Sequence, residues 1–425
     1  MNLNAIIDSL KDCPCGRKHS FDLKYYECES GLVHRCGEIL KANSFPKKIY
    51  VVTDESAFRA AEGIVESLEK AGFDMEIKVY PDMKYAYMAT SDEILKASES
   101  FDGILSVGTG SVNDVCRYAA ARADKAFAIF GTAPSMDGFA SDSAPLIANN
   151  FKISYPCRQP SIVLADADIL AASPDELKSA GFGDVIAKYV GIVDWKVARY
   201  TVGEYYCENI VKLVKDTVDN VMTLADKVTS KSPEAAKAIM DTLILTGCAM
   251  QLAKCTRPAS GSEHVVSHFW EIHKLEKGIW PDYHGKKVGM ATLLVTKIYK
   301  ALLKYDEIEP TKERFVIDDV LSHYSERNKD EILGYNIPLP TDEIDLEKFK
   351  ADWKLIKEDI RTVLPDYDVL LEAMKKAGCA TTLEECNLSP EFAIEGLIYS
   401  PYMRRRITLL RIMCMFCDME EDIFL

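Results

Sequence analysis

The chain has 425 residues, of which 48% are hydrophobic and 28% charged, enough for two to three domains with packed cores. This composition excludes disordered, collagen-like and coiled-coil proteins, and no apolar run reaches the ~18 residues of a membrane span. The 66 acidic residues against 51 Lys and Arg give a net charge of −15, which disfavours docking on nucleic acid or an anionic membrane. The first residues lack a basic region followed by an apolar stretch, so no secretory signal is expected. We therefore expect a soluble, cytoplasmic enzyme or binding protein.

The thirteen cysteines are an odd number spread over a long chain, which is typical of reduced thiols. One group stands apart, where Cys13-Pro14-Cys15 is followed by His19. Further thiols and an imidazole come downstream: Cys28, His34 and Cys36. Such residues can bind a metal, but the CxC spacing departs from the CxxC of zinc ribbons. Reduced thiols are the favoured interpretation, and the role of Cys13, Cys15 and His19 stays open.

Strand and helix signals alternate in the first part of the chain. β-branched, aromatic or apolar runs predict strands over residues 48–53, 75–80, 103–107 and 126–130. Helical patterns separate them at residues 57–71, 91–98 and 112–122. This order indicates βαβ units and a parallel sheet over residues 40–170.

Long amphipathic helical patterns replace this alternation after Pro174. They cover residues 184–200, 209–227, 233–254, 285–305 and 346–363. The basic run 404–406 also lies inside an apolar helical pattern. The sequence therefore predicts an α/β domain over residues 1–170, with a Cys-containing extension at 1–40, and an all-α domain over residues 171–425.

A glycine-containing loop follows the strand predicted at 103–107 and opens a helix. Its residues are Gly108, Thr109, Gly110, Ser111 and Val112. Small residues here let backbone N–H groups and a helix N-terminus approach a phosphate. The loop departs from GxGxxG, because Asn113 holds the third glycine position, and an ordinary tight turn is the alternative.

Polar residues also follow the strand predicted at 126–130. Thr132, Ser135, Asp137 and Ser141 lie at the carboxyl end of a parallel strand, where open α/β sheets bind ligands. A solvated loop would have a similar composition, so this segment supports a ligand site without identifying it.

Four of the seven histidines fall between residues 264 and 284. His264 and His268 are four residues apart and thus share a helix face, and His284 begins another helical pattern. This cluster favours a metal site. Asp184, at the start of the helix predicted over 184–200, is a candidate carboxylate ligand, although a helix cap is the simpler reading of that residue alone.

In these motifs the sequence resembles the sn-glycerol-1-phosphate dehydrogenases, within the superfamily of iron-containing alcohol dehydrogenases, glycerol dehydrogenases and dehydroquinate synthases. The matching segments run in order from about residue 47 to residue 413. They are Asp54 at a strand end, 108–114, 132–138, 181–188, 260–264, His268, 284–285 and the predicted helix at 405–410. The resemblance implies the dehydroquinate synthase-like architecture: a Rossmann-like parallel sheet followed by a helical domain.

The resemblance also implies roles for individual residues. Asp184, His264 and His284 would bind one divalent metal (zinc, nickel or iron), and Asp184 would border the substrate. His268 and Asp137 would act on the substrate as catalytic residues. Contacts to NAD or NADP would come from Asp54, Gly108, Thr109, Gly110, Ser111, Val112, Thr132, Ser135 and Ser141. The implied reaction is the reversible reduction of dihydroxyacetone phosphate to sn-glycerol 1-phosphate, a step of phospholipid metabolism, with the metal polarising the substrate oxygen.

Two departures from the family pattern leave alternatives open. Thr109 and Ser111 replace the usual glycine and basic residue, so the choice between NAD and NADP is not fixed. The interval from His264 to His284 is long, which predicts a small insertion near residues 276–280. A glycerol or other polyol dehydrogenase is the main alternative, and a dehydroquinate synthase-like cyclase is disfavoured because its motif has Glu where Asp184 stands. Lys188 and the run 404–406 are suspects for holding a substrate phosphate, and relatives commonly form dimers or larger assemblies, so a homo-oligomer is a further expectation.

Overall fold

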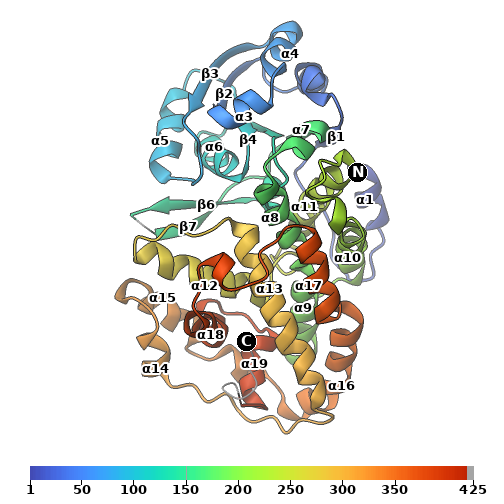
Figure 1. The fold of residues 1–425 in the computed structure, drawn as a ribbon, viewed down its shortest axis with the longest axis vertical. Helices are drawn as coiled ribbons and strands as arrows, with labels where there is room; N and C mark the ends of the chain where they lie inside the picture. Colours follow the sequence, from blue (N-terminus) through green and yellow to red (C-terminus); the bar gives the residue numbers. More distant parts are fainter. Residues whose placement is uncertain (150, 419–425) are drawn as a thin grey trace.

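The computed structural model describes residues 1–149 and 151–418, which form a sheet covered by helices and a larger group of helices below it (Figure 1). Within these residues, six parallel strands form one sheet in the order β1-β8-β5-β4-β2-β3. The strands are β1 (Tyr25–Glu29), β2 (Lys48–Asp54), β3 (Asp74–Tyr80), β4 (Gly103–Gly108), β5 (Ala126–Gly131) and β8 (Ile162–Asp166). The predicted parallel α/β fold is confirmed, and β2 to β5 fall on the four predicted strands.

Helices cover both faces of the sheet, because successive side chains of a strand point to opposite sides. In β2, Ile49 and Val51 pack in the core under α2 (Cys36–Ala42) and α4 (Ile64–Ala71). Tyr50 and Val52 pack instead in the core under α5 (Met88–Ala97) and α6 (Gly110–Arg122). This two-sided burial fixes the register of the strands and the position of the loops at their carboxyl ends.

Three features of this half differ from the sequence-based expectation. β1 lies inside the predicted extension 1–40 and pairs with β8 at the edge of the sheet. The helix predicted over 57–71 is divided into α3 (Glu55–Ala60) and α4, because Gly63 between them has a φ of +94°. An antiparallel hairpin of β6 (Ser143–Ala148) and β7 (Phe151–Pro156) was not predicted and lies between the sheet and the helices below (Figure 1).

The remaining helices precede the sheet or follow it. They are α1 (Leu3–Ser9), α7 (Ala167–Ala172), α8 (Asp175–Ile186), α9 (Lys188–Val202), α10 (Glu208–Met222), α11 (Pro233–Ala253), α12 (Ser262–Glu276), α13 (His284–Ala301), α14 (Ile317–Ser322), α15 (Glu326–Asn336), α16 (Leu346–Val363), α17 (Tyr367–Lys376), α18 (Pro390–Tyr399) and α19 (Leu409–Ile412). Short 3-10 turns are η1 (Leu32–Arg35), η2 (Asp137–Ala140), η3 (Ala225–Lys227), η4 (Leu302–Lys304), η5 (Pro340–Glu343), η6 (Glu384–Cys386), η7 (Ser400–Met403) and η8 (Met413–Met415). Among the described residues, every helix is too short or too polar to cross a lipid bilayer.

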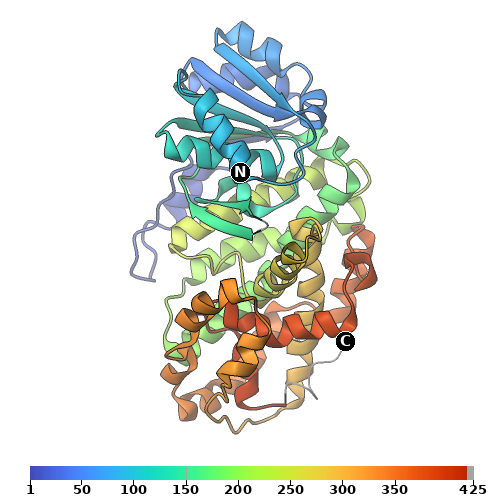
Figure 2. The same ribbon diagram turned by 90° about the vertical axis from the view of Figure 1, so that its left-hand side faces the viewer.

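Helix α11 belongs to both cores of the molecule. Met240 and Ile244 pack among the sheet residues, whereas Ile239 and Leu243 pack in the helical core. The turned view shows this helix (yellow-green) passing between the sheet and the lower helices (Figure 2). The domain boundary near residue 170 stays a prediction, because a helix from the second half completes the core of the first.

Candidate functional site

Three helices bring one carboxylate and two imidazoles together below the sheet. Asp184 lies in the last turn of α8, His264 in the first turn of α12, and His284 is the first residue of α13. One ligand atom from each residue lies within 4.8 Å of the other two. Asp184 does not cap the helix predicted over 184–200, because α8 begins at Asp175 and ends just after Asp184.

Two glycine contacts explain why α8 and α13 approach so closely. A Cβ on Gly183 would lie 2.5 Å from the carbonyl oxygen of Gly285, and a Cβ on Gly285 would lie 1.9 Å from that of Ala180. Any side chain at these positions would force the helices apart. The glycines beside Asp184 and His284 therefore set the separation of these two ligands.

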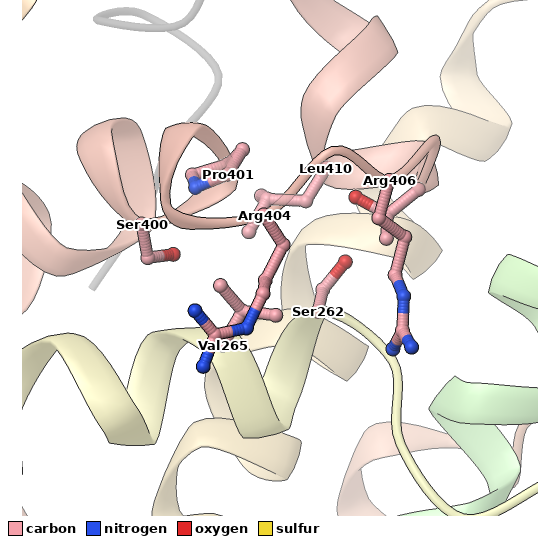
Figure 3. Close-up of a pocket in the computed structure, with 8 residues that line it drawn as sticks. Ser262, Val265, Ser400, Pro401, Arg404, Arg406 and Leu410 are labelled. Carbon is pink, nitrogen blue, oxygen red and sulfur yellow. The ribbon is translucent and has the colours of Figure 1, made fainter. Parts of the chain in front are cut away.

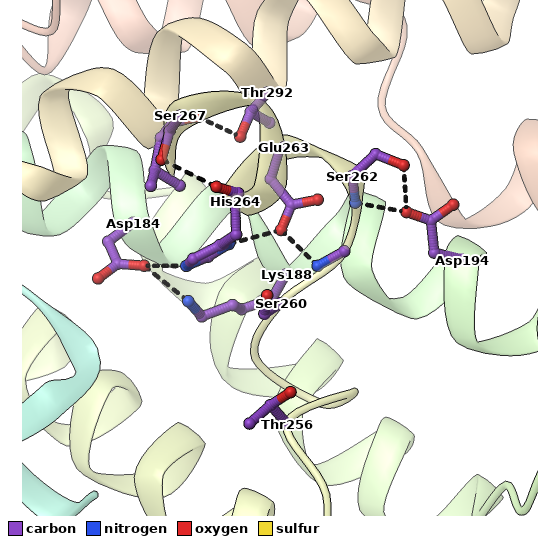
Figure 4. A network of polar contacts seen from close by, with 12 residues as sticks. Asp184, Lys188, Asp194, Thr256, Ser260, Ser262, Glu263, His264, Ser267 and Thr292 are labelled. Atoms are coloured by element: carbon purple, nitrogen blue, oxygen red, sulfur yellow. Dashed lines mark hydrogen bonds and ion pairs between the residues drawn. The ribbon is translucent and has the colours of Figure 1, made fainter. Parts of the chain in front are cut away.

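His264 is oriented by its neighbour in sequence, Glu263 (Figure 4). The Nδ1 atom of His264 lies 2.7 Å from Oε1 of the buried Glu263, and a carboxylate only accepts, so Nδ1 carries the proton. This leaves Nε2 to face Oδ1 of Asp184 at 3.6 Å. Metal-binding histidines commonly donate their second N–H to a carboxylate in this way.

The donor set fits a divalent transition metal. Ligand atoms about 2.0–2.2 Å from such an ion lie roughly 3–3.5 Å apart, close to the Asp184–His264 distance. Burial alone would raise the pKa of Asp184, but Lys188 and the hydrogen bond from His264 hold it well below its usual range. Burial also lowers the pKa of His284 to about 3, which keeps this imidazole neutral. Ionised Asp184 and neutral His284 are the ligand forms of these groups.

The pKa of His264 moves in the opposite direction. Burial would lower it, but the hydrogen bonds to Asp184 and Glu263 raise it to about 9. A cation is thus favoured between these two carboxylates, whether it is a proton on His264 or a bound metal.

Lys188 connects the triad to the loop after β5. Its Nζ donates to Oδ1 of Asp184 at 2.7 Å and to Oδ2 of Asp137 at 2.8 Å, and the N–H of Asp137 donates to Oδ2 of Asp184 at 2.9 Å. The lysine side chain is fully buried. Lys188 therefore positions the two aspartates and is not available to hold a substrate phosphate, contrary to the suspicion raised from sequence.

His268 lies beside the triad as its spacing predicts. Its ring centroid is 5.7 Å from that of His284 and 6.2 Å from that of His264. Burial is the main reason that its pKa falls well below the usual range, and the nearby charge of Arg404 lowers it further. The ring is therefore neutral at physiological pH.

Two lysines that the sequence analysis missed lie near this group. Lys152 from β7 and Lys287 from α13 each bind Oε1 of Glu271, at 3.0 Å. Two cations against one carboxylate leave a net positive charge beside His284, whose pKa Lys152 also lowers after the larger effect of burial. No sequence signal marks Lys152, because it lies on the unpredicted hairpin.

The start of α12 is held by a buried carboxylate. Oδ2 of Asp194 accepts from the N–H of Ser262 at 2.6 Å and from its hydroxyl at 2.8 Å (Figure 4). Its Oδ1 accepts from the hydroxyl of Tyr299 at 2.7 Å and from the N–H of Leu409 at 2.8 Å. Burial and the charge of Glu263 raise the pKa of Asp194 to about 6. This network fixes the helix end that carries Glu263 and His264.

The glycine loop has the predicted strand–turn–helix geometry. β4 ends at Gly108 and α6 begins at Gly110, with Thr109 as a cap residue whose side chain makes no capping hydrogen bond. The N–H of Thr132 donates to the carbonyl of Gly108 at 3.1 Å, so the loops after β4 and β5 lie side by side. The amino end of a 13-residue helix at this place suits an anion such as a phosphate.

Met136 links the two loops and was not singled out in the sequence. A Cβ on Gly110 would lie 2.4 Å from the methyl carbon of Met136, and a Cβ on Gly138 would lie 2.6 Å from it. The flexible end of the methionine side chain thus fills the space that the two glycines leave open between the loops.

The other predicted nucleotide residues have partners within the protein. Oδ1 of Asp54 accepts from the N–H of Ala57 at 2.8 Å and caps α3. The hydroxyl of Ser141 lies 3.0 Å from that of Ser143, and Ser135 is buried. These residues border the carboxyl ends of the strands, and their contact with a nucleotide stays a prediction.

The basic run 404–406 is not helical. It forms the loop between η7 and α19, and its three arginines point to different partners. Arg405 donates to the carbonyl of Pro338, Arg406 donates to that of Ser260 at 2.9 Å, and Arg404 lies close enough to His268 for its charge to lower the pKa of that ring, after the larger effect of burial. Figure 3 shows Arg404 lying against α12 while Arg406 points away from it.

Neither of two cavities in the structure is the reaction site. One of about 10 Å³ beside Arg404 and Ser262 has room for about one water (Figure 3). Another of about 380 Å³ is bordered by Phe45, Lys125 and Arg158. It lies at the amino ends of β5 and β8, whereas parallel sheets bind ligands at the carboxyl ends.

Comparisons with known proteins agree with this fold. Residues 27–174 match the family model described as iron-containing alcohol dehydrogenase. The fold is similar to that of a glycerol dehydrogenase from Schizosaccharomyces pombe, with a TM-score of 0.62 and 15% identity over 96% of this chain and 91% of that one. An NADH-dependent butanol dehydrogenase from Thermotoga maritima has a TM-score of 0.60 at 14% identity, covering 95% and 96% of the two chains. The fold is thus that of the iron-containing alcohol dehydrogenase class.

Curated relatives identify the family within this class. The glycerol-1-phosphate dehydrogenase [NAD(P)+] of Halalkalibacterium halodurans is 31% identical over 297 residues, which cover 68% of this chain and 74% of the relative. That of Bacillus subtilis is 31% identical over 312 residues, 72% and 74% of the two chains. The chain belongs to the glycerol-1-phosphate dehydrogenase family and is an enzyme, as the resemblance in sequence indicates.

Proposed function

We propose that this protein is a metal-dependent, NAD(P)-linked dehydrogenase that reduces dihydroxyacetone phosphate to sn-glycerol 1-phosphate. The observation that carries the proposal is the convergence of Asp184, His264 and His284 within 4.8 Å. Relatives in the same family bear the name of this activity and of both nucleotides.

The triad is assigned to the metal, and His268 to the substrate. Zinc, nickel or iron bound by the triad would supply a Lewis acid for the ketone oxygen. His268 is assigned to orient that oxygen or relay its proton, because its neutral ring lies next to both ligand imidazoles. Asp137, bound to Lys188, is assigned to a substrate hydroxyl.

The nucleotide is assigned to the loops at the carboxyl ends of β4 and β5. Residues 108–112 would hold the pyrophosphate with the backbone N–H groups at the start of α6. Thr132, Ser135, Ser141 and Asp54 are assigned to the rest of the nucleotide. The hydrogen bond between Asp137 and Asp184 ties these loops to the triad, which supports hydride transfer from a nicotinamide placed between them.

Arg404 and Lys152 are our candidates for the substrate phosphate. After the larger effect of burial, the charge of Arg404 lowers the pKa of His268 and that of Lys152 lowers the pKa of His284, so both cations lie near the histidines of the proposed site. Arg404 is the more available of the two, because 46% of its side chain is exposed.

A coupled assay tests the proposal. The metal-loaded protein is given NADH or NADPH together with dihydroxyacetone phosphate, dihydroxyacetone or simple aldehydes. We expect nicotinamide oxidation with the phosphorylated ketone and little with the others. Equal turnover of dihydroxyacetone would instead identify an enzyme for unphosphorylated polyols.

A further inference from the structure

A second cluster of metal-ligating side chains lies away from the triad, where the N-terminal segment meets the start of α10. It joins Cys13, Cys15 and His19 to Cys207, and one atom from each of the four lies within 4.8 Å of the other three. Cys28 and Cys36, which the sequence offered as further ligands, are buried in β1 and α2 instead.

The distances are within about 0.3 Å of those in a tetrahedral zinc site. With zinc–sulfur bonds of about 2.3 Å and zinc–nitrogen bonds of about 2.0–2.1 Å, the ligand atoms lie roughly 3.4–3.8 Å apart. Here Cys13 Sγ lies 3.4 Å from Cys207 Sγ, and Nε2 of His19 lies 3.1 Å from Cys15 Sγ and 3.9 Å from Cys207 Sγ. The sulfurs of Cys13 and Cys207 are too far apart for the ~2.05 Å of a disulfide.

The imidazole of His19 is held in the form that binds a metal. Its Nδ1 lies 2.8 Å from the carbonyl oxygen of Leu252, which only accepts, so Nδ1 carries the proton. The lone pair of Nε2 then faces the three sulfurs. Because the His19 ring is buried, this orientation is fixed by the fold.

Polar groups lie against two of the sulfurs. Nδ2 of Asn209 donates to Cys13 Sγ at 3.4 Å, and the hydroxyl of Tyr205 lies 3.4 Å from Cys15 Sγ. Cys207 is the cap residue of the 15-residue helix α10, so its position is fixed by the start of that helix. Three cysteine sulfurs and one imidazole form a complete set of four protein ligands, which is typical of structural zinc.

We propose that Cys13, Cys15, His19 and Cys207 bind one structural zinc ion that fastens the N-terminal segment to the helical half of the molecule. Residues 10–24, between α1 and β1, contain no helix or strand and lead directly into the edge strand of the sheet. A metal ion bound by both Cys13 and Cys207 would link two positions that are 194 residues apart in the sequence. The site shares no residue with the triad, so a test of the zinc site does not depend on whether the proposed reaction is correct.

Zinc content tests the site directly. The whole protein, loaded with zinc and dialysed, is compared with Cys15→Ser, Cys207→Ser and the matched control Cys255→Ser by plasma mass spectrometry. We expect each of the first two variants to hold one zinc ion per chain fewer than the wild type, and Cys255→Ser to hold the same number. His264→Ala should lose a different ion and keep this one.

Cobalt substitution of the wild type gives a second test that does not depend on whether a variant folds. Because the triad contains no sulfur, an intense thiolate-to-cobalt absorption band can come only from a cysteine site. We expect that band, together with the ligand-field bands of a tetrahedral ion. Its absence, equal zinc content in Cys15→Ser and Cys255→Ser, or a Cys13–Cys207 disulfide found by peptide mass mapping would each overturn the proposal.

Discussion

The triad and the N-terminal cluster offer metals different atoms on different kinds of support. The triad presents one carboxylate and two imidazoles from three helices, two of which are held together by glycine contacts. The cluster presents three sulfurs and one imidazole, three of the four from a segment without regular structure. Three ligands leave positions for a substrate, whereas four thiolate and imidazole ligands close the coordination sphere. We therefore expect the triad to control turnover and the cluster to control the stability of the fold.

The largest effect is expected for His264→Ala. Loss of this ligand should lower kcat/KM by at least about 1000-fold, because a Lewis acid contributes several kcal/mol to the transition state. NADH binding, followed by fluorescence titration, should persist, and the zinc of the N-terminal cluster should remain. The matched control is His34→Ala on η1. Full activity of His264→Ala would refute the role of the triad.

Glu263→Gln tests whether the triad depends on a group that does not touch the metal. The amide cannot accept as strongly from Nδ1 of His264, so metal affinity at the triad should fall about 10- to 100-fold. Competition with a chromogenic chelator measures this affinity. An unchanged affinity would show that the contact between Glu263 and His264 has only a structural role.

Arg404→Gln separates phosphate recognition from the chemistry. Loss of a partly exposed, charge-assisted contact should lower kcat/KM for dihydroxyacetone phosphate about tenfold and leave slow turnover of dihydroxyacetone unchanged. Arg405→Gln, whose guanidinium binds Glu343 and the carbonyl of Pro338, is the matched control. Equal losses with both ketones would assign Arg404 to the structure of the loop instead.

The pH dependence of metal binding sharpens the comparison further. Below pH 9 a metal must displace one proton from His264, whose pKa is raised to about 9, whereas His284 is already neutral. Affinity at the triad should therefore rise about tenfold per pH unit between pH 6 and 8. Without metal, the raised pKa stabilises the fold fully below about pH 6.5, and this contribution is lost as the pH rises through 9. Titration calorimetry in buffers of different pH checks the slope, and a flat profile would contradict the protonated form of His264.

The elements that could be predicted from the sequence are those with a clear pattern of apolar residues. β2 to β5 were found because each is a short apolar run followed by turn residues. Helix α8 was missed because it is buried on all sides from Lys178 to Ile186, so its sequence has no apolar stripe to detect. The helix prediction therefore began at Asp184, where α8 is in fact ending. The helix prediction for residues 404–406 was wrong for the opposite reason. Apolar residues occur there at helical spacing, but they belong to a loop that packs into the core.

The candidate site was predictable in its ligands and less so in their surroundings. His264, His268 and His284 cluster in the sequence itself, and the family pattern added Asp184. Lys152 and Cys207 gave no local signal, because the chain brings them in from a hairpin and from a helix start far away in sequence. Glu263 was visible only as the neighbour of a histidine, and its role depends on a hydrogen bond that spacing cannot reveal.

Helix α11 packs in both hydrophobic cores, and this has a consequence for any attempt to divide the enzyme into fragments. A fragment ending at residue 170 would expose the apolar sheet residues that Met240 and Ile244 cover, and a fragment beginning at residue 171 would expose those two side chains. Neither fragment should fold stably by itself in water. A substitution that bends α11 would therefore disturb the packing of both cores at once, and with it the contact between the sheet and the helices that carry the triad.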